Sequence, residues 1–132
     1  MADTKSYKIL IIDDDKFLLD MYSIKFSEQG FGVDTALGSE VALEKIDNSL
    51  RPDIFLIDLL MPKIDGFQLI EKLRERGIGR ESVIIILSNL GQKEDIDRGL
   101  NLGVDGYIIK AAATPSEVVA KVIDISKKKH YV

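Results

Sequence analysis

Short apolar runs alternate along this chain with segments of helical periodicity. Runs at 8–12, 53–57 and 83–87 are rich in β-branched residues and predict buried strands, and weaker strands are predicted at 31–36 and 104–109. Strands that alternate with helices form βαβ units with right-handed crossovers around a parallel sheet. The pattern therefore predicts an α/β fold of the flavodoxin-like type, a doubly wound five-stranded parallel sheet flanked by five helices.

The first two helices are predicted from their apolar faces and end signals. The first covers 16–29, stops at Gly30, and is expected to bury Phe17, Met21, Ile24 and Tyr22 or Phe26. The second is expected to be capped by Ser39 and to bury Val41, Ala42, Leu43 and Ile46.

The other three helices carry weaker or different signals. The third follows Asp65-Gly66, and the fourth, at about 92–102, has few apolar residues. The last begins at Thr114, which forms a capping box with Glu117. The lysines at 127–129 are expected to form a solvated helix end.

Length and composition limit the class of protein. A chain of 132 residues is expected to form a single domain, 1–132, with a core at about 7–129. It has no cysteine, no apolar run near the roughly 18 residues of a membrane span and no signal peptide, so we expect a cytoplasmic protein. The net charge of -4 argues against a general nucleic-acid surface.

Acidic residues stand just past two of the predicted strands. Asp13, Asp14 and Asp15 end the first run, and Asp58 ends the third. The carboxyl ends of parallel strands line one crevice, so these carboxylates should meet there and require a cation. Carboxylate oxygens are hard ligands that select Mg²⁺ or a similar ion, whereas His130, the only histidine, lies in the tail.

The other strand ends supply different chemical groups. Ser88 and Asn89 follow the fourth strand, and Lys110 follows the fifth. An aspartate can attack phosphorus, a hydroxyl can hydrogen-bond a phosphoryl oxygen, and an ammonium can neutralise another, which together suit phosphoryl transfer. Taken singly, Ser88 would be a turn residue and Lys110 a surface lysine, and Asp15 is well placed to cap the first helix.

The segments KILIIDDD, DLLMPKIDG, IIILSN and GYIIK together resemble the receiver domains of two-component response regulators, similar to the single-domain chemotaxis type. The resemblance spans nearly the whole chain. It implies a phosphorylatable signalling switch that accepts a phosphoryl group from a histidine kinase with Mg²⁺ and changes its partner-binding surface. Such a domain is not an enzyme in the usual sense, although it promotes its own aspartyl phosphorylation and dephosphorylation.

The resemblance also assigns roles at the acidic crevice. Asp58 becomes the phosphoacceptor. Asp13 and Asp14 become the acidic pair that holds Mg²⁺ with Asp58, Asp14 directly and Asp13 through water. The backbone carbonyl of Leu60 completes the protein ligands.

Beyond the crevice, the resemblance implies a switch and a set of partners. Ser88 senses the phosphoryl group, Lys110 is the lysine of the site, and Tyr107 is the aromatic residue that turns inward on activation, although half-buried packing alone would also explain Tyr107. The partners are a histidine kinase or phosphotransfer protein and a downstream protein target. A dimer through the fourth helix, fifth strand and fifth helix is compatible with this pattern, and neither direct nucleic-acid binding nor a membrane is expected.

Two positions depart from the family pattern. Ala111 stands where a proline, commonly after a cis peptide, usually follows the lysine, and we expect a trans bond because a cis bond before a non-proline residue costs about 2.5 to 4 kcal/mol. Asn89 replaces a small residue, and its bulk is expected to narrow the path of small phosphodonors.

Two alternatives remain open from the sequence. A haloacid-dehalogenase-type phosphatase would use Asp13 as nucleophile with Asp15 in a D-x-D motif, but that family would want Thr or Val where Phe17 stands. A flavodoxin would need a Ser/Thr/Gly-rich phosphate loop after the first strand, which this chain lacks.

Overall fold

A parallel five-stranded sheet forms the centre of the protein, as residues 7–130 of the computed structural model describe it. The strand order is β2-β1-β3-β4-β5. The bounds are β1 (Lys8–Asp13), β2 (Gly32–Leu37), β3 (Ile54–Ile57), β4 (Val83–Ser88) and β5 (Gly106–Ile109). Every neighbouring pair is parallel. The predicted fold class is confirmed.

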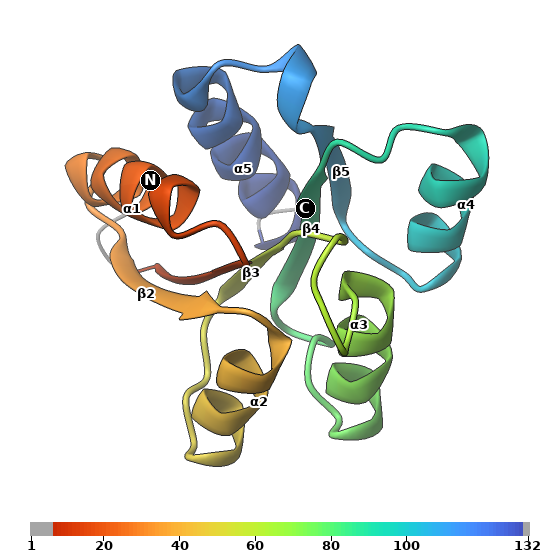
Figure 1. Ribbon diagram of the computed structural model, residues 1–132. Helices are drawn as coiled ribbons and strands as arrows, with labels where there is room; N and C mark the ends of the chain where they lie inside the picture. Colours follow the sequence, from red (N-terminus) through yellow and green to blue (C-terminus); the bar gives the residue numbers. More distant parts are fainter. Residues whose placement is uncertain (1–6, 131–132) are drawn as a thin grey trace.

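Five helices cover the two faces of this sheet (Figure 1). Their bounds are α1 (Lys16–Glu28), α2 (Ser39–Asp47), α3 (Gly66–Glu75), α4 (Lys93–Asn101) and α5 (Pro115–His130). Helices α1 and α5 lie on one face, and α2 and α3 lie on the other with α4 toward the β5 side. Within the described residues, no helix is long and apolar enough to span a membrane.

Two apolar cores lie on opposite faces of the sheet because side chains of a strand alternate between faces. In β1, Leu10 and Ile12 point to the core under α2 and α3, whereas Ile9 and Ile11 point to the core under α1 and α5. Each central strand is therefore buried on both sides, which explains the continuous apolar runs in the sequence.

The expected buried face of α1 is only partly right: Tyr22 and Phe26 are buried as predicted and Met21 packs against the core, but Phe17 and Ile24 are not buried. Phe17 and Ile24 are 74% and 60% exposed, and the buried residues are Leu19, Tyr22 and Phe26. Apolar residues occur around most of this helix, so periodicity alone could not choose the face that meets the sheet.

The expected cap of α2 is also wrong. Gly38, with φ of 89°, occupies the N-cap position, and Ser39 is the first helical residue. The buried Ser39 hydroxyl donates a hydrogen bond of 2.8 Å to the Ile64 carbonyl instead. Val41, expected to be buried, is 40% exposed.

The capping box at the start of α5 is confirmed. Thr114 N donates to a Glu117 carboxylate oxygen at 2.8 Å, and Glu117 N donates to the Thr114 hydroxyl at 3.2 Å. At the other end of α5, the prediction that the lysines at 127–129 are solvated is wrong for Lys129. Lys129 Nζ lies 2.6 Å from the Ser82 carbonyl and 3.1 Å from Asp105 Oδ2.

Candidate phosphoryl-transfer site

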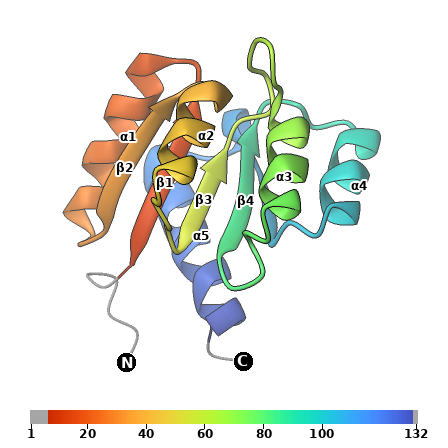
Figure 2. The same cartoon turned by 90° about the horizontal axis from the view of Figure 1, so that it is seen from below.

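The predicted site residues lie at the carboxyl edge of the sheet, toward which the strand arrowheads point in Figure 2. From β1 the chain crosses first to β2 on one side and later to β3 on the other, so the strand order reverses at β1. Ile12 and Ile57 are register partners, which places Asp13 and Asp58 side by side one residue later. Ligands of open α/β sheets bind at such a reversal.

Three carboxylates meet at this point. Asp13, Asp14 and Asp58 each offer an oxygen, and these oxygens lie within 4.8 Å of one another. Asp13 and Asp58 are buried and Asp14 is exposed. Backbone groups hold the two buried ones: Asp15 N donates to Asp13 Oδ1 at 3.1 Å, and Leu59 N donates to Asp58 Oδ1 at 2.8 Å.

Lys110 reaches into the cluster from the end of β5. Its ammonium lies 2.7 Å from Asp13 Oδ2 and 3.4 Å from Asp58 Oδ2, and only 13% of its side chain is exposed. Burial lowers the pKa of Lys110, but the hydrogen bond to Asp13 and the charge of Asp58 outweigh burial and raise it above the usual value. Lys110 is therefore a fixed cation that faces Asp13 and Asp58.

The pKa of Asp58 is raised above its ordinary value. Burial is the main cause, and the neighbouring Asp13 charge adds to it, while Lys110, the Ser88 hydroxyl and the Leu59 N–H oppose it. The cluster thus brings two buried carboxylates, Asp13 and Asp58, together beside the exposed Asp14. Its all-oxygen donor set fits a hard divalent cation, so Asp13, Asp14 and Asp58 are compatible with Mg²⁺.

Ser88 and Tyr107 lie beside the cluster and are connected through Leu90. Ser88 is fully buried at the end of β4, and its hydroxyl accepts a hydrogen bond from Leu90 N at 3.4 Å. The half-buried Tyr107 donates its hydroxyl to the Leu90 carbonyl. Burial, together with the charges of Asp95 and Asp58, raises the pKa of Tyr107.

Two glycines shape the site without contributing side chains. A β-carbon at Gly66 would overlap the Asp58 carbonyl oxygen and lie 2.8 Å from Leu59 Cα, so only glycine lets the start of α3 approach the Asp58 backbone. A β-carbon at Gly99 would lie 2.9 Å from Ile86 Cδ1 and 3.3 Å from the Tyr107 ring. In the sequence, Gly66 is only part of the dipeptide before the third predicted helix, and nothing there singles out Gly99.

Other predicted residues have structural partners or open surroundings. Asp15 caps α1, since its carboxylate accepts from Phe17 N and Leu18 N, as expected. The Leu60 side chain is 56% exposed at the rim of the crevice. The Lys110–Ala111 peptide is trans, like every peptide in the described part of the chain, which confirms that expectation.

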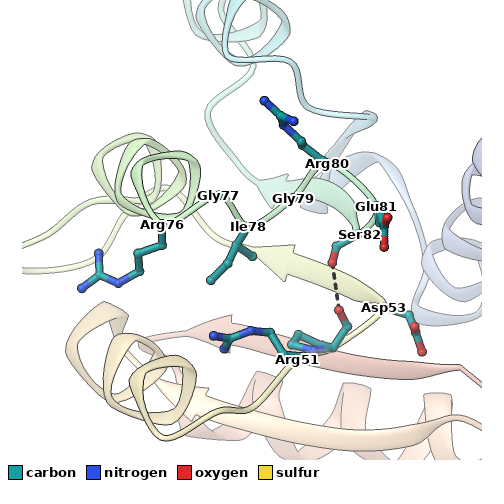
Figure 3. Close-up of a pocket in the computed structure, with 10 residues that line it drawn as sticks. Arg51, Asp53, Arg76, Gly77, Ile78, Gly79, Arg80, Glu81 and Ser82 are labelled. Atoms are coloured by element: carbon teal, nitrogen blue, oxygen red, sulfur yellow. Dashed lines mark hydrogen bonds between the residues drawn. The ribbon is translucent and has the colours of Figure 1, made fainter.

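A pocket of about 510 Å³ lies far from these residues, at the amino edge of the sheet. Figure 3 shows Arg51 and Arg76 on one side of it, Asp53 and Glu81 on the other, and the Ser82 hydroxyl bonded to the Pro52 carbonyl. Arg51 donates to the Ile46 and Leu50 carbonyls, and Arg76 pairs with Asp47, so these cations fasten the local backbone and a neighbouring helix.

Comparison with known families agrees with the geometry of the carboxyl edge. Residues 9–123 match the family described as the response regulator receiver domain. The chain belongs to this family. Receiver domains are phosphorylatable switches of two-component signalling, and they interact with histidine kinases and downstream effectors. Membership leaves the phosphatase and flavodoxin alternatives without support, and Asp15 of the supposed D-x-D motif caps a helix.

Relatives place this receiver domain among two-component regulators. It is 34% identical over 103 residues to the DNA-binding dual master transcriptional regulator RpaA of Synechocystis, covering 78% of this chain and 42% of that protein. It is 32% identical over 115 residues to the phosphate regulon regulatory protein PhoB of Rhizobium meliloti, covering 87% of this chain and 50% of that protein. The chain thus spans half or less of the length of these regulators.

Solved structures match the receiver domain over nearly its whole length. The receiver domain of Francisella response regulator 1452 superposes with a TM-score of 0.82 at 33% identity, covering 93% of this chain and 98% of that one. A two-component response regulator from Clostridium difficile superposes with a TM-score of 0.83 at 29% identity, covering 95% and 99%.

Proposed function

We propose that this receiver domain accepts a phosphoryl group on Asp58 from a histidine kinase or a phosphotransfer protein. The observation that carries the proposal is the placement of Asp58, a buried carboxylate at the reversal of strand order with Lys110 3.4 Å away. One oxygen of Asp58 is held by Leu59 N, and the other faces the ammonium. A carboxylate oxygen so oriented is prepared to attack phosphorus.

The transfer exchanges one bond to phosphorus for another. A phosphohistidine donor loses its P–N bond as an Asp58 oxygen forms a P–O bond, and the leaving imidazole takes up a proton from solvent. Lys110 neutralises negative charge on the moving group, and the Ser88 hydroxyl donates to one of its oxygens after transfer. Catalysis of this kind depends on positioning and charge neutralisation, so the domain needs no further acid or base.

We further propose that Mg²⁺ binds to Asp13, Asp14 and Asp58, with the Leu60 carbonyl as an additional ligand. Three carboxylates against one ammonium leave a formal charge of -2, which a divalent cation would balance. When bound, the ion would supply the positive charge that draws phosphoryl oxygens into an acidic crevice. Because Asp14 is exposed, the proposed Mg²⁺ position is open to solvent.

The output is proposed to be a changed surface on α4, β5 and α5. A new bond from Ser88 to the phosphoryl group would draw the loop after β4 inward and shift Tyr107, a population shift limited by that extra contact. This surface would bind a downstream protein or a second copy of the chain. We propose a cytoplasmic location and no direct contact of this domain with nucleic acid or a membrane.

Mass spectrometry of intact protein tests the phosphoacceptor. Incubation with Mg²⁺ and acetyl phosphate, or with a phosphorylated histidine kinase, should add one phosphoryl group to the wild type and none to Asp58→Asn. The matched control is Asp124→Asn, an exposed aspartate paired with Lys128, which should label normally. Labelling that survives in Asp58→Asn would overturn the assignment.

Amide spectra test the switch. Addition of beryllofluoride and Mg²⁺ should change the resonances of residues 88–110 in the wild type and leave them unchanged in Asp58→Asn. Unchanged resonances in the wild type would contradict the proposed route through Ser88 and Tyr107.

A further inference from the structure

Asn89 joins two loops of the site by a hydrogen bond. It follows Ser88 at the end of β4, and its Oδ1 accepts a hydrogen bond of 2.9 Å from the backbone N–H of Ala111. Ala111 is the residue directly after Lys110 in the short 3-10 turn Lys110–Ala112. The bond therefore ties the loop that contains Ser88 to the backbone that carries the Lys110 ammonium.

The identity of residue 111 makes this bond available. A proline there would have no N–H to donate, whereas Ala111 donates from a trans peptide. Both partners are required: the carboxamide oxygen at 89 and a secondary amide at 111. The amide at 111 is exposed, so water would replace Asn89 if its side chain were shortened.

The same loop is held at a second point. Tyr107, three residues before Lys110, donates its hydroxyl to the Leu90 carbonyl, and Leu90 N donates to the Ser88 hydroxyl. Two residues of the segment 107–111 are thus hydrogen-bonded to the loop, one to residue 89 and one to residue 90. Movement of Ser88 must then either carry the Lys110 backbone with it or break the bond from Ala111.

The place of Lys110 depends on its backbone as well as on its ion pairs. Its ammonium lies closer to Asp13, at 2.7 Å, than to Asp58, at 3.4 Å. If the backbone at 110–111 were free to shift, the long lysine side chain could follow Asp13 and leave Asp58. A fixed peptide beside Lys110 limits that drift.

We propose that Asn89 is a positioning residue for Lys110. Its side chain fixes the peptide after Lys110, so that the ammonium stays between Asp13 and Asp58 and is coupled to the position of Ser88. This inference rests on the proposed phosphoryl transfer to Asp58. It differs from a role for Asn89 as a bulky obstacle, because an obstacle acts through volume and a positioning residue acts through its acceptor oxygen.

Three substitutions distinguish the effect of the Asn89 acceptor oxygen from the effect of its side-chain volume. Asn89→Leu keeps the branched shape and removes the acceptor, Asn89→Ala removes both, and Asn89→Asp keeps an acceptor oxygen. Asn101→Ala, at the exposed end of α4, serves as the control. All four variants should unfold at nearly the wild-type temperature.

The first measurement is hydrogen exchange of the Ala111 amide in unphosphorylated protein. We expect faster exchange in Asn89→Ala and Asn89→Leu, and protection close to that of the wild type in Asn89→Asp and Asn101→Ala. Unchanged exchange in Asn89→Leu would overturn the inference, because the bond would then not exist in solution.

The second measurement is the initial rate of phosphorylation by acetyl phosphate at saturating Mg²⁺. Loss of one hydrogen bond predicts a fall of about two- to tenfold in both Asn89→Ala and Asn89→Leu, with Asn89→Asp faster than Asn89→Leu. A faster rate in Asn89→Ala with a normal rate in Asn89→Leu would show an obstacle and refute positioning. Normal rates in both would also refute it.

The outcomes distinguish this inference from the proposed function. If wild-type protein takes up no phosphoryl group, or if Asp58→Asn is labelled equally, the proposed function fails and the positioning role falls with it. If the wild type is labelled at Asp58 but the three Asn89 variants are phosphorylated as fast as the wild type, only the inference about Asn89 fails.

Discussion

Two partly buried lysines lie at opposite edges of the same sheet, and their surroundings differ. At the carboxyl edge, Lys110 is 13% exposed and contacts Asp13 and Asp58, with Asp14 close by. At the amino edge, Lys129 is 24% exposed and contacts Asp105. Both are lysine–aspartate pairs, but only the first has an excess of carboxylates.

Backbone groups complete the pair at the amino edge. Lys129 also donates to the Ser82 carbonyl, and Asp105 Oδ2 accepts from Ile84 N at 2.8 Å. Nearby, the Arg74 guanidinium donates to the carbonyls of Gly79, Leu102 and Gly103. One carboxylate, that of Asp105, balances the charge of Lys129. Main-chain groups supply the other hydrogen-bond partners of these two side chains.

The difference indicates how one type of ion pair can serve two purposes. A pair whose charges and hydrogen-bonding groups are satisfied internally fastens loops and helix ends together. A cluster with surplus negative charge favours a bound cation and a group that brings its own oxygens. We therefore expect changes at the carboxyl edge to alter chemistry and ion binding, and changes at the amino edge to alter stability.

Ion binding gives the largest expected contrast. Mg²⁺ at about 100 times its Kd should raise the free energy of unfolding by about 2.7 kcal/mol, because it binds the folded state. Asp14→Ala should remove most of this gain, whereas Lys129→Met should keep it. Denaturant unfolding with and without Mg²⁺ measures both. An equal gain in the free energy of unfolding in Asp14→Ala and wild type would contradict the expected difference between the two edges.

Loss of the amino-edge lysine should mainly affect stability. Lys129→Met should lower the free energy of unfolding by about 2 kcal/mol, because Asp105 and the Ser82 carbonyl lose a charged donor. The control is Lys128→Met, a neighbouring lysine in an exposed pair, which should change it by less than about 0.5 kcal/mol.

Phosphorylation by acetyl phosphate should stay normal in both lysine variants. If Lys129→Met were as stable as Lys128→Met, the network at the amino edge would have no structural role.

The lifetime of the phosphoryl group at the carboxyl edge should depend on two apolar side chains. Leu60 and Leu90 line the same groove beside Asp14, and an apolar side chain cannot orient a water toward phosphorus. We expect slow self-dephosphorylation, and a double variant Leu60→Asn, Leu90→Glu that loses phosphate about tenfold faster, equivalent to about 1.4 kcal/mol of barrier.

The matched control for lifetime is Leu100→Asn, since Leu100 is 55% exposed and Leu60 56%. Loss of radioactive phosphate from purified phosphoprotein gives the rates. Decay of wild type within seconds, or equal decay of the double variant, would refute the role of these leucines.

The smallest expected effect concerns a carboxylate near the carboxyl edge whose partner is the main chain. The hydrogen bond from Thr114 N lowers the pKa of Glu117 below its ordinary value. Its stabilising contribution is therefore complete above the unfolded-state pKa and is lost as the pH falls through the lower folded-state pKa.

Thermal unfolding between pH 3 and 7 checks the Glu117 effect. Wild type should lose stability relative to Glu117→Gln as the pH falls, and the change should be independent of Mg²⁺. A difference between the two proteins that does not vary with pH would contradict the assignment.

Much of the architecture and the location of the site followed from sequence. The apolar runs predicted all five strands, and β1, β2, β3 and β4 agree within one residue at each end, whereas β5 begins two residues later than predicted. The capping residues Asp15 and Thr114 were also predicted. Because parallel strands bring their carboxyl ends to one edge, the sequence predicts the juxtaposition of Asp13, Asp14 and Asp58.

The buried face of α1, the cap of α2 and the partners of Lys129 were decided only by the tertiary structure. Each depends on how far one element slides or rotates against another, which local periodicity does not specify. The close approach permitted by Gly66 and the bond from Ala111 to Asn89 join residues distant in sequence. The sequence by itself determined the elements and the edge at which they meet, because those follow from short-range patterns. Packing of the whole chain decided which side chains touch, because each contact depends on the positions of all the others.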